Sequence, residues 1–156
     1  MTESALPENK APISLFTIGF AGKSAEEFFT ALRAAGVERL IDVRLNNVSQ
    51  LAGFTKRRDL EYFLKVIAGI AYEHNTELAP TSDILDAYKK KALAWEDYER
   101  RFVALLDERA VADRDTPLHF DHACLLCSEP EPDQCHRRLV AEYLRRQWPE
   151  VVIEHL

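Results

Sequence analysis

The residues best suited to chemistry gather in residues 122–143, which read HACLLCSEPEPDQCHRRLVAEY. Thiols and imidazoles bind metals and act as catalytic groups, carboxylates transfer protons, and guanidinium groups bind anions. This segment holds all of these types: Cys127, Glu129, Cys135, His136, Arg137 and Arg138. A site that combines nucleophiles, proton carriers and cations is therefore expected here.

The local pattern of this segment predicts how its groups are positioned. Residues 123–126 are a short apolar run, typical of a buried strand. Residues 129–132 contain two prolines, which interrupt both strand pairing and helix. Asp133 is a candidate N-cap, and a helical spacing of apolar residues follows it at Leu139, Val140, Tyr143 and Leu144. The segment therefore predicts a strand, a tight loop and a helix, with the chemical groups at the junction.

The cations at this helix start favour an anion-binding site. The first turn of a helix has unpaired N–H donors and a partial positive charge, so it disfavours His136, Arg137 and Arg138. A phosphate bound there would accept hydrogen bonds from both the backbone and the guanidinium groups. The alternative is that the arginines point to solvent or pair with nearby glutamates.

The thiols allow a second interpretation. A cysteine at a helix N-terminus beside cations has a lowered pKa, and Cys135 fits that description, which makes it the expected nucleophile. Cys127, at the end of a buried strand, is more typical of a small core residue. Cys124 is expected in the core. Cys127 and Cys135 would also form a reversible redox couple if the loop brings them together.

Metal binding is a third interpretation. Cys124 and Cys127 resemble a metal-binding pair by spacing, but residues three apart on a strand point to opposite faces and cannot easily chelate one ion. The remaining candidate ligands are Cys127, Cys135 and His136. No ion is identified by this pattern alone.

Composition limits the class of protein. The chain has 156 residues, 47% of them hydrophobic and 29% charged, which suits one globular domain. A net charge of −6 argues against a protein that coats nucleic acid. No apolar run is long enough for a membrane span, and the polar N-terminus does not resemble a secretory signal. With three cysteines, these features predict reduced thiols and a cytoplasmic location.

The alternation of strand and helix patterns predicts an α/β fold. Residues 1–12 read as a flexible tail and residues 13–156 as a single Rossmann-like domain. Its sheet should contain about five mainly parallel strands, covered by helices on both faces, with Leu125 and Leu126 in the central strand and residues 151–153 in a neighbouring one. The strands are expected at residues 13–20, 37–43, 70–74, 123–126 and 151–156, and the helices after Ser24 and at 55–68, 81–93, 96–112 and after 133.

The carboxyl ends of parallel strands are where such sheets bind ligands. Gly19 and Gly22 follow the first strand, and Asp42 and Arg44 follow the second. These residues are therefore expected to lie beside Cys127 and the helix start. Gly19 and Asp42 resemble the glycine loop and ribose-binding acid of a dinucleotide site, although the full glycine pattern is missing. The alternative is that the glycines serve a turn and Asp42 pairs with Arg44.

Several of these pieces resemble a known family, the domains of unknown function numbered 488. The matching motifs are Thr17-Ile18-Gly19, Ile41-Asp42-Val43-Arg44, Gly69-Ile70-Ala71-Tyr72 and, most specifically, the segment from Leu125 to Arg138 with its Cys-Ser-Glu and Cys-His-Arg-Arg groups. The resemblance implies a compact Rossmann-like domain without an established activity. Phe20 stands where the family often has a histidine, so no imidazole is expected at the end of the first strand.

Two classes of function fit these patterns. The first is a small enzyme acting on a phosphate-bearing substrate, either a nucleotide or a nucleic acid. Its expected catalytic residues are Asp42, Glu129, Cys135 and His136, and its expected substrate-binding residues are Gly19, Arg44, Arg137 and Arg138. The second is a non-catalytic module that binds an anion or a metal with the same cluster. Acids near the anion favour the enzyme, because a binding module gains nothing from them.

Overall fold

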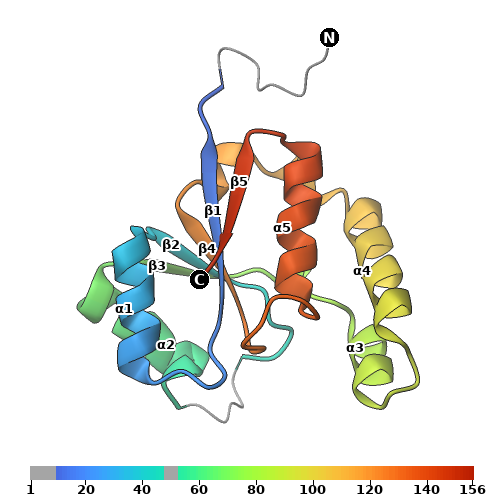
Figure 1. Ribbon diagram of the computed structural model, residues 1–156, viewed down its shortest axis with the longest axis horizontal. Coiled ribbons are helices and arrows are strands. Elements are labelled where there is room, and N and C mark those ends of the chain that lie inside the picture. The colour runs from blue at the N-terminus through green and yellow to red at the C-terminus, as the bar shows by residue number, and fades with distance from the viewer. Residues whose placement is uncertain (1–9, 48–52) are drawn as a thin grey trace.

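A five-stranded, all-parallel sheet forms the centre of the molecule, in the order β3-β2-β4-β1-β5 (Figure 1). The computed structural model describes residues 10–47 and 53–156. Its strands are β1 (Ile13–Gly19), β2 (Arg39–Asp42), β3 (Ala71–His74), β4 (Ala123–Cys127) and β5 (Val151–His155). The sheet confirms the predicted α/β fold and its parallel strands.

Strand β4 lies in the middle of the sheet, as predicted, between β2 and β1. All five of its residues are buried, which explains why its sequence is apolar without alternation. Strand β5 pairs with β1 at the edge of the sheet, so the prediction that residues 151–153 form a strand next to β4 is wrong. The edge position fits its mixed pattern, in which only Val151 is fully buried.

Helices cover both faces of the sheet (Figure 1). One face packs against α1 (Ala25–Ala35), α2 (Arg57–Phe63) and the π-helical turn η2 (Leu64–Ala68). The other face packs against α4 (Trp95–Arg109) and α5 (His136–Gln147), with α3 (Ser82–Lys89) beside α4. Single 3₁₀ turns complete the connections: η1 (Gly53–Thr55), η3 (Thr76–Leu78), η4 (Val111–Arg114) and η5 (Pro117–Phe120).

Alternating side chains of the strands divide the core into two layers. Leu125 and Cys127 of β4 point toward α4 and α5, whereas Cys124 and Leu126 point toward α1 and α2. Cys124 and Cys127 are therefore on opposite faces, as the strand pattern predicted. Of the two cysteines in β4, only Cys127 therefore faces the layer that contains α5.

Local signals explain where most helices begin and end. Ser24 and Glu27 form the expected capping box at the start of α1, and Gly36 ends it in the left-handed region at a φ of 76°. Gly69 ends the second helical region in the same way. That region, expected as one helix over 55–68, is divided into η1, α2 and η2. Ser49 and Gln50, expected in a loop, and residues 1–9 of the expected tail lie outside the described residues.

The N-cap of α5 was predicted at the wrong residue. Asp133 lies in a turn, and the N-cap is Cys135, with an extended backbone at φ −135°. The backbone N–H of Cys135 donates to the Pro132 carbonyl at 3.2 Å, so the proline-rich loop makes one more turn before the helix starts. No side chain caps this helix. Cys135 is consequently the N-cap of α5, and His136 is its first helical residue.

No helix within residues 10–47 and 53–156 combines enough length with enough apolar character to cross a membrane.

Candidate functional site

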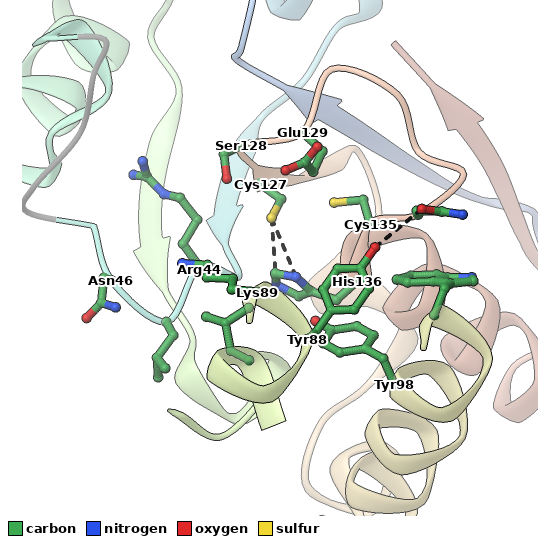
Figure 2. A pocket seen from close by; sticks show the side chains of 14 residues that line it. Arg44, Asn46, Tyr88, Lys89, Tyr98, Cys127, Ser128, Glu129, Cys135 and His136 are labelled. Atoms are coloured by element: carbon green, nitrogen blue, oxygen red, sulfur yellow. Dashed lines mark hydrogen bonds between the residues drawn. The ribbon is translucent and has the colours of Figure 1, made fainter. Parts of the chain in front are cut away.

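A cavity of about 470 Å³ opens at the carboxyl ends of β2 and β4 (Figure 2). Its walls come from the segments after these strands, from the start of α5 and from the turn between α3 and α4. The lining residues are Arg44, Leu45, Asn46, Leu85, Tyr88, Lys89, Trp95, Tyr98, Cys127, Ser128, Glu129, Gln134, Cys135 and His136. Its location agrees with the rule that parallel sheets bind ligands beyond their strand ends.

The cavity brings together part of the expected site. Its lining includes Cys127, Glu129, Cys135, His136 and Arg44, which come from three separate segments of the chain. The other expected residues do not line it: Gly19, Asp42, Arg137 and Arg138. The structure therefore separates residues that face the cavity from residues that hold its walls in place.

His136 is held in a defined orientation by the backbone of a neighbouring strand end. Its Nε2 lies 2.7 Å from the carbonyl oxygen of Val43, so this nitrogen must carry the proton that is donated. The other ring nitrogen, Nδ1, lies 3.5 Å from the Cys127 Sγ. The ring is also packed edge-on against Phe102, with centroids 5.5 Å apart. A nucleophile, a base and a group that orients the base are thus aligned.

The electrostatic environment favours the thiolate at Cys127. The neighbouring Cys135 thiol, whose Sγ lies within 4.8 Å, lowers the pKa of Cys127 below the usual range, although burial acts in the opposite direction. The Ser128 backbone N–H and the positive charge of Arg137 lower this pKa further. Because Cys127 also lines the cavity, a thiolate here faces any molecule that enters.

Cys135 was expected to be the reactive thiol, and it lies within 4.8 Å of Cys127 in a buried pair. The neighbouring Cys127 and burial both raise the pKa of Cys135, despite the nearby cations. Burial also raises the pKa of Cys124, which lies on the other face of the sheet. The helix-terminus argument did not consider the neighbouring Cys127 sulfur, which competes with Cys135 for the same positive charge.

Arg137 is completely buried, at 0% exposure. Its Nη1 donates to the Glu129 carbonyl at 2.6 Å and to the Cys135 Sγ at 3.4 Å, and its Nε donates to the Thr17 hydroxyl at 3.1 Å. The Pro130 carbonyl, 3.4 Å from Nη2, completes the set. The guanidinium therefore joins β1, the proline-rich loop and Cys135. It does not face a ligand, contrary to the expectation for this residue.

Gly19 is required by a close approach of the chain. A Cβ at this position would lie 1.6 Å from the Glu129 carbonyl oxygen and 2.9 Å from the Arg137 Nη1. The absence of a side chain lets the loop after β4 cross the end of β1 and present its carbonyl to Arg137. Gly19 thus shapes the site from behind, and the substrate-binding role expected for it has no contact in the cavity.

Asp42 and Arg44 form a buried ion pair. The Asp42 carboxylate accepts two hydrogen bonds from the guanidinium, each at 2.8 Å, and a third from the Tyr72 hydroxyl at 2.7 Å. Arg44 also donates to the Thr55 carbonyl. Burial, followed by the Asp42 charge, raises the pKa of Tyr72. The pairing of Asp42 with Arg44 is the alternative that the sequence left open. Asp42 is fully buried and does not line the cavity, so it does not contact a ligand there.

The remaining expected residues lie toward the surface. Arg138 pairs with Glu142 at 3.1 Å and lies 6.0 Å above the Trp95 ring, outside the cavity lining. The Glu129 side chain is exposed and lines the cavity beside Cys127 and Ser128, as Figure 2 shows. Among the expected acids, Glu129 is the one that a ligand in the cavity would contact.

Several cavity residues were not identified from the sequence. Tyr88 and Lys89 come from the end of α3, and Trp95 and Tyr98 come from the start of α4. The i, i+3 spacing of Trp95 and Tyr98 places both rings on one helix face, which is a detectable signal. Nothing in the sequence indicated that this face lies opposite Cys127.

Three candidate metal ligands also meet here. The Sγ atoms of Cys127 and Cys135 and a ring nitrogen of His136 all lie within 4.8 Å of one another, and all three residues are buried. This is the ligand set predicted from the sequence. Two thiolates and an imidazole suit a soft transition metal such as Zn²⁺, and the cavity would leave a fourth position open.

Comparisons with known proteins place the chain by sequence. The family described as domain of unknown function DUF488 matches residues 24–144, which include β2, β4 and most of α5. The matched residues thus include Cys127, Cys135 and His136. Neither the curated proteins nor the solved structures contain a match.

Proposed function

Because the chain belongs to the DUF488 family, whose description assigns no reaction, we propose a function from the geometry of its site: the protein is an enzyme that uses the Cys127 thiolate as a nucleophile on a small phosphate-bearing substrate. The observation that carries this proposal is the alignment of Cys127 and His136 at the wall of the cavity, 3.5 Å apart. The Val43 carbonyl orients the imidazole, which is the arrangement of nucleophile, base and orienting group.

The buried charges around Cys127 support a thiolate in the resting protein. Arg137 supplies a full positive charge, and the neighbouring Cys135 thiol also lowers the pKa of Cys127. Both act on a sulfur that lines the cavity. Arg137 does not line the cavity, so it is a positioning residue in this proposal, whereas Cys135 is part of the cavity wall.

The proposed reaction proceeds in two steps. The Cys127 sulfur forms a bond to the electrophilic atom of the substrate while the bond to the leaving group breaks, and the leaving group departs with the electron pair. His136, whose Nδ1 holds the proton taken from the Cys127 thiol, gives that proton to the leaving group. Water then attacks the thiol-linked intermediate as its bond to sulfur breaks, and Glu129 accepts a proton from the water. Release of this proton to solvent and uptake of one proton by His136 restore the starting pair of thiolate and protonated imidazole. Each step leaves atoms and charges balanced without a further reactant.

Two features support an anionic substrate. Lys89 lines the cavity, and among the described residues it has no ion-pair partner. The start of α5, at Cys135 and His136, forms another part of the wall, and the first N–H groups of a helix have no partner within the helix. A phosphate held between them would replace the anion-binding role that had been expected for Arg137.

The proposal is tested by measuring the rate at which iodoacetamide alkylates the protein between pH 5 and pH 9. We expect labelling of Cys127 at a pH well below that needed for a free thiol, identified by peptide mass spectrometry. Cys127→Ser should lose this fast labelling, and the matched control Cys124→Ser should keep it. His136→Gln should shift the profile toward higher pH. Fast labelling that persists in Cys127→Ser would disprove the assignment.

A metal site is the second candidate function, because three donor atoms lie within 4.8 Å. In this alternative, Cys127, Cys135 and His136 hold a divalent ion, and the cavity supplies the open position. Titration with Co²⁺ distinguishes the two functions. A tight complex with thiolate-to-cobalt absorption, lost in Cys135→Ser, would favour the metal, whereas no complex at micromolar protein would favour the free nucleophile.

A further inference from the structure

The side of the cavity opposite Cys127 is an aromatic wall, which we define as Tyr88, Trp95 and Tyr98. Trp95 and Tyr98 are stacked, with centroids 5.2 Å apart and planes at 23°. Tyr88 lies 4.8 Å from Tyr98 and 5.7 Å from Trp95. The wall is built from the end of α3 and the start of α4, so the two helices present their rings to the same space.

The three rings do not have the same role in this wall. Tyr98 is only 2% exposed and supports the other two from behind. Tyr88 and Trp95 are partly exposed, and both line the cavity. They also border a second hollow of about 560 Å³ on the outer side of the α3–α4 turn. Tyr88 and Trp95 are thus partly exposed rings at the cavity, and a ligand stacked there would share Trp95 with Tyr98 and with the Arg138 guanidinium, which lies 6.0 Å from the Trp95 centroid.

Polar groups stand at the edge of these rings. The Tyr88 hydroxyl donates to the Gln134 side chain at 3.3 Å, and both residues line the cavity. Lys89 follows Tyr88 directly and lines both hollows. The cavity thus combines a stacking surface, an amide that forms hydrogen bonds and a lysine, and it ends at the start of α5.

We propose that this cavity binds a mononucleotide, with its base against the Tyr88 and Trp95 rings and its phosphate toward Lys89 and the start of α5. This inference deepens the proposed function, because it names the substrate class for the Cys127 site. Every base has a π-face and stacks on aromatic side chains. In this orientation the phosphate end of the ligand, and not its base, approaches Cys127.

The size and charge of the molecule favour a mononucleotide over a nucleic acid. A volume of about 470 Å³ lies within the range of small-molecule sites, roughly 300–1,000 Å³. The chain carries a net charge of −6, which opposes the approach of a long polyanion. One lysine and one helix start are sufficient for a single phosphate but do not form an extended basic track.

Calorimetric titration of the Cys127→Ser protein tests the inference, because this variant binds without reacting. The ligands are nucleoside 5′-monophosphates with each base, the matching nucleosides, ribose 5-phosphate, inorganic phosphate and a short oligonucleotide. We expect at least one monophosphate to bind more tightly than its nucleoside and more tightly than ribose 5-phosphate. Trp95→Leu should weaken that binding about tenfold, the effect of losing one stacked ring.

Matched variants separate binding from folding. Trp95→Phe keeps a ring and should bind nearly as wild type does, so a loss in Trp95→Leu alone identifies stacking. Lys89→Met should weaken binding of the monophosphate but not of the nucleoside. The adjacent Lys90, which does not line the cavity, provides the control Lys90→Met, which should change neither.

The possible outcomes distinguish this inference from the proposed function. Equal binding of ribose 5-phosphate and the monophosphates would overturn the stacking role, and tighter binding of the oligonucleotide would replace the mononucleotide with a nucleic acid. The absence of binding by every ligand would also overturn the inference. None of these results changes the alkylation of Cys127 in the wild-type protein, which tests the nucleophile separately.

Discussion

Two buried arginines, Arg44 and Arg137, lie near the strand ends of this protein, and different groups compensate their positive charges. Arg44 is 3% exposed and forms two 2.8 Å hydrogen bonds with the Asp42 carboxylate. Arg137 is 0% exposed, and within the described residues its guanidinium has no carboxylate partner. Its partners are two backbone carbonyls, a hydroxyl and a thiol.

The difference indicates which of the two charges is available for chemistry. A buried charge is costly unless an opposite charge or several hydrogen bonds compensate it. Asp42 gives Arg44 an opposite charge, so the net charge of that pair is zero, although the Nη1 of Arg44 has no hydrogen-bond partner among the described residues. The charge of Arg137 is only partly compensated by neutral groups, and it stabilises a negative charge on Cys127. The first arginine therefore serves the fold, and the second links the fold to the proposed nucleophile.

Removing the compensation from Arg44 should give the largest effect on stability. Asp42→Ala leaves a buried guanidinium without its anion and Tyr72 without its acceptor. We expect a loss of about 3–5 kcal/mol in the free energy of unfolding, the range for breaking a buried ion pair. Urea denaturation measures it. The double variant Asp42→Ala/Arg44→Met should recover part of the loss, and a failure to recover would show that the charge of Arg44 is not its cause.

Removing Arg137 should cost less stability but should affect the thiol. Arg137→Met leaves no carboxylate unpaired among the described residues, and it removes hydrogen bonds to Thr17, Glu129 and Cys135. We expect a loss of about 2 kcal/mol, in the range for hydrogen bonds of a charged group. Alkylation of Cys127 at neutral pH should also become slower, because the pKa of the thiol rises. An unchanged alkylation profile would separate Arg137 from the nucleophile.

The pH dependence of stability should identify which thiol is ionised. The pKa of Cys127 is lower in the folded protein than its usual value near 9, so the folded state binds fewer protons just below that pH. The stability from this group is present above pH 9 and is lost as the pH falls through the folded pKa. Above pH 9 the raised pKa values of Cys124 and Cys135 act in the opposite direction.

The comparison between variants isolates this effect. Urea unfolding of wild type and Cys127→Ser is measured from pH 5 to pH 9, and the difference between their unfolding free energies should grow as the pH rises. Cys124→Ser should not show such a trend over this range. A difference that stays constant with pH would mean that Cys127 remains protonated in the folded protein.

The smallest effect is expected at Arg138, which is only partly buried, unlike Arg44 and Arg137. Arg138→Gln removes the pair with Glu142 and the weaker one with Glu99, both in contact with solvent. Such pairs contribute about 0.3–0.5 kcal/mol, and we expect a change of that size in thermal unfolding. Alkylation of Cys127 should be unaffected. A larger change in either measurement would place Arg138 among the groups that shape the site.

The sequence predicted the fold well because its signals are local. The apolar run of β4, the capping box at Ser24 and Glu27 and the terminating Gly36 each depend on residues close in sequence. The start of α5 was predicted at Asp133, which has the right side chain for an N-cap, but the proline-rich loop continues to Cys135. One residue that favours the N-cap position is not enough to locate the start of a helix, because the same residues can form a turn before it.

The site was predicted in composition but not in its assignments. Cys127, Cys135 and His136 were identified as one cluster, and they lie together. The environment of the thiols was not predicted, because it depends on the close approach of Cys127 and Cys135 and on the buried position of Arg137. The wall of Tyr88 and Trp95 was also missed, since its position relative to Cys127 depends on how α3 and α4 pack on the sheet.

The order of the strands has a consequence for how the protein is assembled. Strands β1 and β2 are not neighbours, because β4 lies between them, and β4 begins only at Ala123 (Figure 1). The sheet therefore cannot become continuous until most of the chain has been synthesised, which implies long-range pairing and slow folding. Cys127 is the last residue of the central strand, and the groups around it come from the start of α5 at Cys135, His136 and Arg137. In an incompletely folded chain these groups are not yet assembled, so the pKa of Cys127 would be that of an ordinary thiol, and it would fall only when folding is complete.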